Sequence, residues 1–336
     1  MTEFKEIAQN PDWQLGSFVP QTSSLRFYKN SAAARKRHNF YDHDYISGVK
    51  METFDVPMQA LIADKAQLTT TKDIGIIAHT AFCGSTLMGR AMHDVYQWSS
   101  VREPNILMEC SVFKVDNPDF ATMQNPFWRD LLDVVVLLLA KDSERAATVI
   151  KLSNSMNNLL GDLQATADYR VTILFNTLTE FLISNYKKQG FQQFIGQLLQ
   201  FYSRMPTYGA IIQQHARQLN DARAVGLLWA LQQDLLAKQK DSIAAQRCKT
   251  LPAEQVFGDL PKAVTDVAEF FCGHSLPAAD RDNPLFQEHS KYQQQAYSVA
   301  AKNAEDEAII QQHQAAFTEA ETFTQQVREL HRLQSL

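Results

Sequence analysis

A stretch of small and hydroxylated residues, His79 to Leu87 (His-Thr-Ala-Phe-Cys-Gly-Ser-Thr-Leu), has the composition of an anion-binding turn. It follows the apolar run at 74–78, which is typical of a buried strand, and it leads into residues with helical spacing. A turn between a strand and a helix directs backbone N–H groups toward a phosphate or a related oxyanion. The sequence therefore predicts a phosphate-binding turn at Phe82–Leu87.

Two features of this turn narrow its chemistry. The loop of ATPases and GTPases has the pattern GxxxxGK[ST], but here no lysine follows Gly84. A nucleotide-dependent kinase with an atypical loop would need a magnesium site, and the sequence shows no convincing strand that ends in a suitable aspartate. Cys83, at the predicted helix start, is either a low-pKa nucleophile or a small residue that fits the turn.

The stretch Thr80–Leu87 resembles the 5′-phosphosulfate loop of sulfotransferases, and is most similar to the AFCxSTLL-type loop of bacterial sulfotransferase-like proteins. Three further segments follow in the order found in that family, at 102–105, 149–154 and 175–184. The resemblance covers residues 73–190. It implies a P-loop-type α/β fold and transfer of a sulfuryl group from 3′-phosphoadenosine-5′-phosphosulfate to a hydroxyl or amine acceptor.

The same resemblance implies how the donor is bound. The residues that would contact its 5′-phosphate are Cys83, Gly84, Ser85 and Thr86. In the family an arginine and, eight residues later, a serine bind the 3′-phosphate; here Asn176 and Ser184 stand at those positions. Phe82 stands where the loop of the family has a basic residue. Loss of two cations should weaken binding of an anionic donor, so a non-catalytic nucleotide- or partner-binding protein on the same fold is the alternative.

The resemblance also implies catalytic roles. Lys151 is similar to a lysine that touches the transferred sulfuryl group, although it could be a surface lysine; Arg90 or Lys187 could add positive charge. Glu103 is the candidate base, which requires a raised pKa or an apolar wall, and it could instead be a turn residue or a helix cap. His79 is the reserve base, with a hydrogen-bonded core histidine as its alternative.

Strands that alternate with helices must position these residues. The apolar runs predict strands at 74–78, 147–151 and 171–175, with 106–108 a strand or a loop. Helical spacing follows Ser85 and recurs at 126–141, 158–166 and 178–188. This order predicts an α/β fold with a mostly parallel sheet flanked by helices. Beyond it, helices are expected at 191–203, 211–240, 261–272 and 294–333.

The predicted organisation has three parts: an irregular or helical segment at 1–70, a P-loop-like α/β core at 71–205, and a helical portion at 206–336 that packs on the core. With 45% hydrophobic residues the chain is typical of a globular protein. Its net charge of −5 gives no overall basic field for nucleic acid. The expected partners are a small-molecule or glycan acceptor and, in a homo-oligomer, further copies of the chain.

Cysteine usage and hydropathy indicate the compartment. The four cysteines form no CxxC pair, which favours a reducing environment and no disulfide scaffold or structural zinc. The longest apolar run, at 134–140, is far below the ~20 residues of a membrane span, and the first residues lack a signal pattern. We therefore expect a cytoplasmic, non-membrane protein. A basic patch at 35–37 is interpreted as a solvated face, and the histidines and aspartates at 38–44 lack a second half for a metal site.

Overall fold

The structure of the protein is a computed structural model that describes residues 2–30, 51–142, 144–287 and 299–336. The basic patch at 35–37 and the histidines and aspartates at 38–44 lie outside these residues. No helix in the described part of the chain is both long and apolar enough to cross a lipid bilayer.

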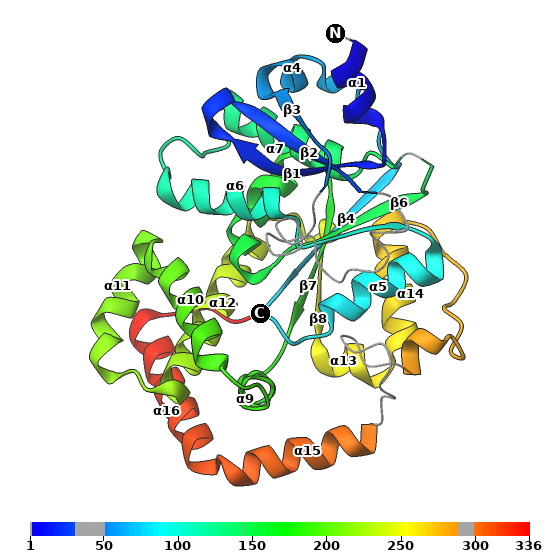
Figure 1. Ribbon diagram of the computed structural model, residues 1–336. Coiled ribbons are helices and arrows are strands. Elements are labelled where there is room, and N and C mark those ends of the chain that lie inside the picture. Colours follow the sequence, from blue (N-terminus) through cyan, green and yellow to red (C-terminus); the bar gives the residue numbers. More distant parts are fainter. Residues whose placement is uncertain (1, 31–50, 143, 288–298) are drawn as a thin grey trace.

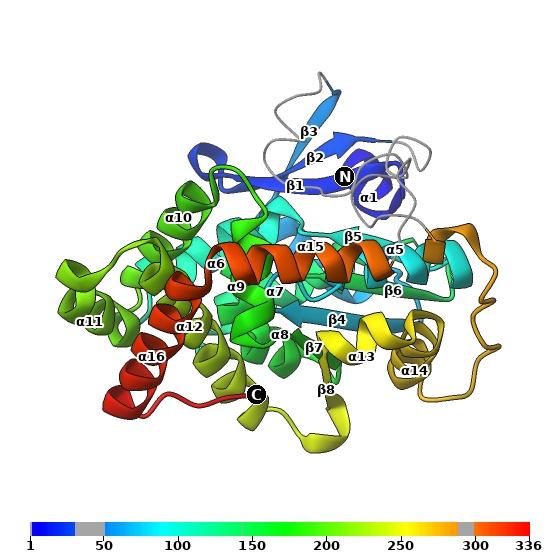
Figure 2. The ribbon, with the colours of Figure 1, turned by 90° about the horizontal axis from the view of Figure 1, so that it is seen from below.

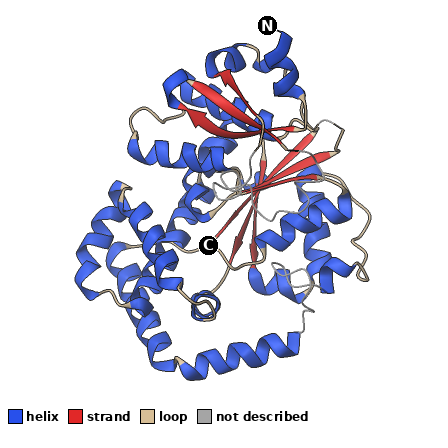
Figure 3. Ribbon diagram, in the orientation of Figure 1, coloured by secondary structure: helices blue, strands red, loops and turns tan. Residues whose placement is uncertain are grey.

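A five-stranded sheet occupies the centre of the molecule (Figures 1 and 3). Its strands are β4 (Asp73–His79), β5 (Ser99–Arg102), β6 (Ala147–Lys151), β7 (Arg170–Phe175) and β8 (Cys248–Pro252). They lie in the order β5-β6-β4-β7-β8, and all four neighbouring pairs are parallel. Because helices cover both faces, the inner strands consist largely of Ile, Val and Ala. The predicted α/β fold with a parallel sheet is confirmed.

The two faces of the sheet belong to separate apolar clusters. Ile76 and Ala78 of β4 pack with α6 (Asn105–Asp116), α7 (Pro126–Leu139) and α8 (Leu160–Thr166). Ile77 points to the other face and packs with α5 (Ser85–Tyr96), α13 (Ala253–Gly258) and α14 (Leu260–Cys272). This alternation is the period of two that a strand requires when both faces are buried.

Further helices form a third cluster beside the sheet, shown at the lower left of Figure 1. They are α9 (Leu178–Tyr186), α10 (Phe191–Ser203), α11 (Pro206–His215), α12 (Asp221–Asp241) and α16 (Gln314–His331). Helix α15 (Val299–Gln312) contacts α9 and leads into α16 (Figure 2). Short 3₁₀ turns complete the chain at Pro20–Thr22, Lys65–Gln67, Asn154–Leu159, Ala216–Gln218, Ala245–Arg247 and Pro284–Gln287.

The N-terminal segment differs from the expectation of irregular or helical structure. Strands β1 (Trp13–Val19), β2 (Ser24–Lys29) and β3 (Thr53–Pro57) form an antiparallel sheet, accompanied by the helices α1 (Thr2–Gln9) and α4 (Met58–Ala63). Leu25 and Phe27 are fully buried against the α6–α7 side of the core. The third strand lies far along the chain from the second, and such pairing is decided by tertiary contacts rather than by local pattern.

Three further expectations are corrected by the structure. The stretch 106–108 lies inside helix α6, and the strand that precedes it is β5, whose mostly polar Ser-Ser-Val-Arg sequence suits the sheet edge. The helix expected at 211–240 is divided, because the side chain of Asn220 caps α12 by accepting the N–H of Arg223 at 3.0 Å. Strand β8 lies within the portion expected to be helical, so the sheet extends beyond residue 205.

We predict that Gly75→Ala destabilises the sheet. A Cβ at Gly75 in β4 would lie 2.3 Å from the ring of Phe271 in α14, and such overpacking costs about 1–3 kcal/mol. The control is Gly196→Ala on α10, where nothing lies within 4 Å of the new Cβ and the helix should gain about 0.5–1 kcal/mol. Urea unfolding measures both, and equal free energies of unfolding for the two variants would contradict this packing.

Candidate anion-binding site at the carboxyl end of the sheet

The predicted strand–turn–helix is present. β4 ends at His79, α5 begins at Ser85, and the intervening residues include three with left-handed backbone, Ala81 (φ 70°), Phe82 (φ 54°) and Gly84 (φ 85°). The N-terminus of α5 has Gly84 as its cap and no side-chain capping bond. Because the first N–H groups of a helix lack partners within the helix, this turn has the geometry of an oxyanion cradle.

His79 stabilises the turn through hydrogen bonds of both ring nitrogens. Its Nδ1 accepts the N–H of Ala81 at 2.9 Å, and its Nε2 lies 2.9 Å from the carbonyl oxygen of Leu152, to which it donates. The imidazole is therefore a neutral tautomer with its proton on Nε2. Both ring nitrogens are engaged and the side chain is buried. The structure therefore favours the hydrogen-bonded core histidine over the reserve base.

Asn176, at the end of β7, is also directed to the turn. Its Nδ2 donates to the carbonyl oxygen of Ala81 at 2.9 Å, and its Oδ1 accepts from Thr80 Oγ1 at 2.8 Å. The side chain is 1% exposed. The position at which the sulfotransferase resemblance implies a 3′-phosphate ligand is thus occupied by a residue whose amide is engaged with the protein.

Lys151 and Glu103 form an ion pair next to the turn. β6 lies between β4 and β5, so Lys151 is aligned with Ile77 on one side and with Arg102 on the other. The N–H of Glu103 donates to the carbonyl oxygen of Lys151 at 2.8 Å, and Glu103 has a left-handed φ of 54°. Lys151 is 1% exposed, whereas the Glu103 side chain is 22% exposed. Strained backbone at a candidate base is typical of functional positions.

The thiol of Cys83 is buried within the turn and is not activated as a nucleophile. It is fully buried and donates to the carbonyl oxygen of Leu174 at 3.4 Å. Burial raises the pKa of Cys83 to about 11, although the charge of Lys151 and nearby backbone N–H groups oppose the increase. This supports the interpretation of Cys83 as a small residue that fits the turn.

Helix α9 approaches the turn on the side of Phe82. The ring of Phe181 lies 5.7 Å from the ring of Phe82, and Lys188 Nζ lies 3.7 Å from the centroid of the Phe82 ring. Ser184 lies three residues after Phe181, so these two residues belong to the same face of α9, whereas Lys188 lies in the turn that follows the helix. Lys188 is a cation that the sequence reasoning missed, and its place at the end of the helix expected at 178–188 was the available signal.

Two other cations considered from the sequence have different surroundings. Lys187 forms ion pairs with Glu305 and Asp306 of α15, each at 2.5 Å, and these pairs join α9 to α15. Their carboxylates raise the pKa of Lys187 against the effect of burial. Arg90 is buried within α5. Lys187 is therefore committed to helix packing and not to the turn.

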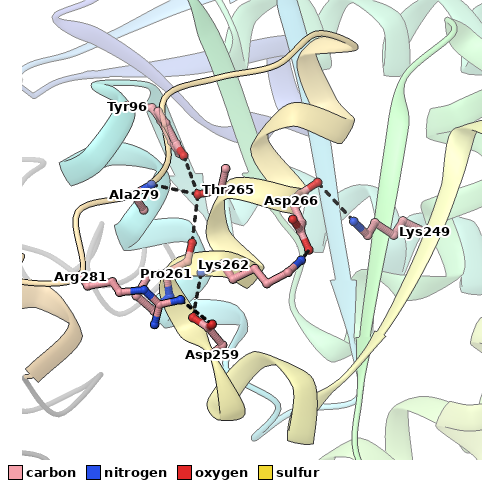
Figure 4. Close-up of polar contacts among 9 residues, drawn as sticks. All are labelled: Tyr96, Lys249, Asp259, Pro261, Lys262, Thr265, Asp266, Ala279 and Arg281. Carbon is pink, nitrogen blue, oxygen red and sulfur yellow. Dashed lines mark hydrogen bonds and ion pairs between the residues drawn. The ribbon is translucent and has the colours of Figure 1, made fainter.

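Helix α13 covers Gly84. A Cβ at Gly84 would lie 2.9 Å from Val256 Cγ1 and 3.3 Å from the Phe257 ring, so only glycine fits there. A polar network around α14, the helix that follows α13, stabilises this region (Figure 4). Asp259 caps α14 and pairs with Arg281 at 2.6 Å, which lowers the pKa of Asp259.

The same network reaches α5 (Figure 4). Thr265 Oγ1 on α14 accepts from the Tyr96 hydroxyl at 3.1 Å and from the Ala279 N–H at 3.0 Å, and donates to the carbonyl oxygen of Pro261. The far end of α5 is thereby attached to α14. Both ends of α5 thus have fixed positions relative to α13 and α14.

Away from the turn, a groove of about 920 Å³ lies between α12 and α16, with Gln218, Arg223, Glu319 and Phe323 in its lining. None of the predicted site residues lines it. Among the described residues, no three His, Cys, Asp or Glu side chains gather in an arrangement that could hold a metal ion.

Two solved structures are similar to this one. A sulfotransferase from Alicyclobacillus acidocaldarius has a TM-score of 0.40 and 14% identity, over 79% of this chain and 96% of that chain. The sulfotransferase domain of the Synechococcus PCC 7002 olefin synthase has a TM-score of 0.38 and 13% identity, over 76% and 95%. Both are sulfotransferases. No protein-family model matches the sequence, and no curated protein matches it. Likeness at this level assigns no activity to the chain.

We predict that Glu103→Gln destabilises the protein by roughly 2 kcal/mol, because it leaves the buried Lys151 charge without a carboxylate; a fully buried pair would give about 3–5 kcal/mol. The double variant Glu103→Gln/Lys151→Met should recover most of this loss, since it removes both charges. A double-mutant cycle by urea unfolding measures the coupling. Additive effects of the two single substitutions would show that the ion pair contributes no coupling free energy.

Proposed function

We propose that the chain is a sulfotransferase-like enzyme that transfers a sulfuryl group from 3′-phosphoadenosine-5′-phosphosulfate to a hydroxyl or amine of a small-molecule or glycan acceptor. The observation that carries the proposal is the ion pair between buried Lys151 and partly exposed Glu103 at the strand ends beside the turn. A cation, a carboxylate and a helix N-terminus at one sheet edge are the groups that sulfuryl transfer needs.

Donor binding would use the turn and the cations around it. The backbone N–H groups at 83–86 would receive the 5′-phosphate, with the hydroxyls of Ser85 and Thr86 adding hydrogen bonds. Phe82 supplies no charge itself, but the Lys188 ammonium lies over its ring and so places a cation next to this residue of the turn. Ser184 lies on the face of α9 that carries Phe181, and it would bind the 3′-phosphate of the donor.

The reaction step would proceed as a displacement at sulfur. The acceptor oxygen or nitrogen forms a bond to sulfur, the bond between sulfur and the 5′-phosphate oxygen breaks, and the acceptor proton moves to the Glu103 carboxylate. The products are the sulfated acceptor and 3′,5′-adenosine bisphosphate. Protonation of Glu103 removes the negative partner of Lys151, so the ammonium becomes available to the leaving phosphate oxygen. Positioning and electrostatics would supply most of the rate.

A non-catalytic binding protein on the same fold is the alternative, and one observation favours it. Phe82 and Asn176, which stand where the resemblance expects cations, are both engaged in contacts within the protein. Such a protein would bind the nucleotide, or a partner, and transfer nothing.

We predict that 3′,5′-adenosine bisphosphate binds the protein and that Lys151→Met weakens this binding about tenfold or more, because a charge-assisted contact to the phosphate contributes ~1.5–3 kcal/mol. Isothermal titration calorimetry measures the dissociation constant. The control is Lys262→Met, which removes an exposed lysine that pairs with Asp266 on α14. The absence of heat at millimolar ligand with the native protein would exclude this donor.

We predict that the protein transfers labelled sulfuryl groups from the donor to at least one acceptor in a panel of phenols, alcohols, amines and oligosaccharides. Glu103→Gln should lower kcat about 10²–10⁴-fold, the usual contribution of a general base, while bisphosphate binding is retained. Circular dichroism confirms that the variant is folded. Bisphosphate binding without transfer to any acceptor in the panel would support the non-catalytic alternative.

A further inference from the structure

Asn176 fixes a strained part of the turn. Ala81 has a left-handed backbone (φ 70°) although it is not glycine, a conformation that requires stabilisation by its surroundings. The N–H of Ala81 is held by His79 Nδ1, and its carbonyl oxygen is held by Asn176 Nδ2, both at 2.9 Å. Thr80, the residue before it, donates its hydroxyl to Asn176 Oδ1 at 2.8 Å. One buried amide thus binds two consecutive residues of the turn.

Asn176 is itself held by helix α12. Its backbone carbonyl oxygen accepts from Trp229 Nε1 at 3.1 Å and from Gln233 Nε2 at 3.2 Å, both on α12. Its N–H donates to Thr80 Oγ1 at 3.3 Å. Trp229, Gln233 and Asn176 are all buried, so water cannot readily replace these bonds. Helix α12 is thereby connected to the turn through Asn176.

We infer that Asn176 is a positioning residue that sets the shape of the anion-binding turn, and that it is not a degenerate ligand for the donor. The amide suits this role because it donates and accepts at the same time, toward a carbonyl and a hydroxyl. An arginine at this position can donate but cannot accept from Thr80. It would also place a cation in a site that is 1% exposed, which is unfavourable without a carboxylate partner. The role in donor binding rests on the function proposed above, whereas the role in shaping the turn does not.

The thiol of Cys83 provides a reporter of the turn that is independent of activity. It is fully buried with a pKa near 11, so alkylation is slow while the turn stays closed. We expect Asn176→Asp to increase the alkylation rate of Cys83, mapped by mass spectrometry, about tenfold, because a carboxylate repels the carbonyl of Ala81. Hydrogen exchange of the amides at 80–86 should accelerate in parallel.

Acidification should reverse this effect. Burial raises the pKa of a carboxyl at position 176, and the protonated acid can donate to Ala81 while it accepts from Thr80, as the amide does. Relative to the native protein at each pH, hydrogen exchange at 80–86 should therefore return toward the native rate as the pH falls from about 8 to 5. A purely steric or global defect would not be restored in this way.

The matched control is Asn185→Asp on α9. This asparagine is also fully buried, and its Nδ2 donates to the carbonyl oxygen of Phe181 at 2.8 Å rather than to the turn. It should lower the free energy of unfolding without selective labelling of Cys83. If Asn176→Asp does not fold, Thr80→Val tests the same bond, because it removes the hydroxyl that donates to Asn176 Oδ1.

Asn176→Arg separates the inference from its rival. A positioning role predicts faster Cys83 labelling and bisphosphate affinity that is weaker by about tenfold or more. A degenerate ligand position predicts tighter binding when the cation is introduced. Tighter binding, or unchanged Cys83 protection in Asn176→Asp and Thr80→Val, would overturn the inference. If the native protein does not bind the bisphosphate, the proposed donor is wrong, and the labelling and exchange results still decide the role of Asn176.

Discussion

The site depends on a tight turn whose strained backbone is stabilised by buried side chains from neighbouring strand ends. Ala81 and Phe82 adopt left-handed φ values without being glycine. Each such residue costs on the order of 1–3 kcal/mol, and the surrounding hydrogen bonds must offset this. His79 and Asn176 hold the Ala81 peptides. The polar groups at this edge of the sheet therefore serve first to maintain the backbone in a shape that can receive an oxyanion.

The charge beside the turn follows a different principle. Lys151 is almost completely buried, and an isolated ammonium there would be strongly unfavourable. Glu103 compensates for it, and parallel pairing of β5 with β6 places the two residues next to each other. Because a carboxylate can accept a proton, Glu103 could serve as a base in addition to balancing the charge of Lys151. The same arrangement would serve a protein that only binds an anion, which is why transfer itself must be measured.

The helical portion is part of the site's support. Helix α12 reaches Asn176 through Trp229 and Gln233, and α13 covers Gly84. On another side, the turn after α9 brings Lys188 to Phe82, and the end of α9 is joined to α15 through the ion pairs of Lys187. Elements that follow the central part of the sheet in sequence therefore decide how open the turn is and which cations lie near it.

Local pattern determined the central elements, because strands buried on both faces produce apolar runs. β4, β6 and β7 were predicted for this reason, as was the strand–turn–helix at 79–87. β5 and β8 were missed because they are edge strands with polar residues, and β3 because its pairing with β2 is non-local. Only the tertiary structure showed that Lys151 is paired, that both ring nitrogens of His79 are engaged, and that Asn176 holds the turn. Residue type and spacing place a side chain on an element, but its partner comes from another strand or helix, and burial then decides whether its polar atoms serve the fold or remain available for chemistry.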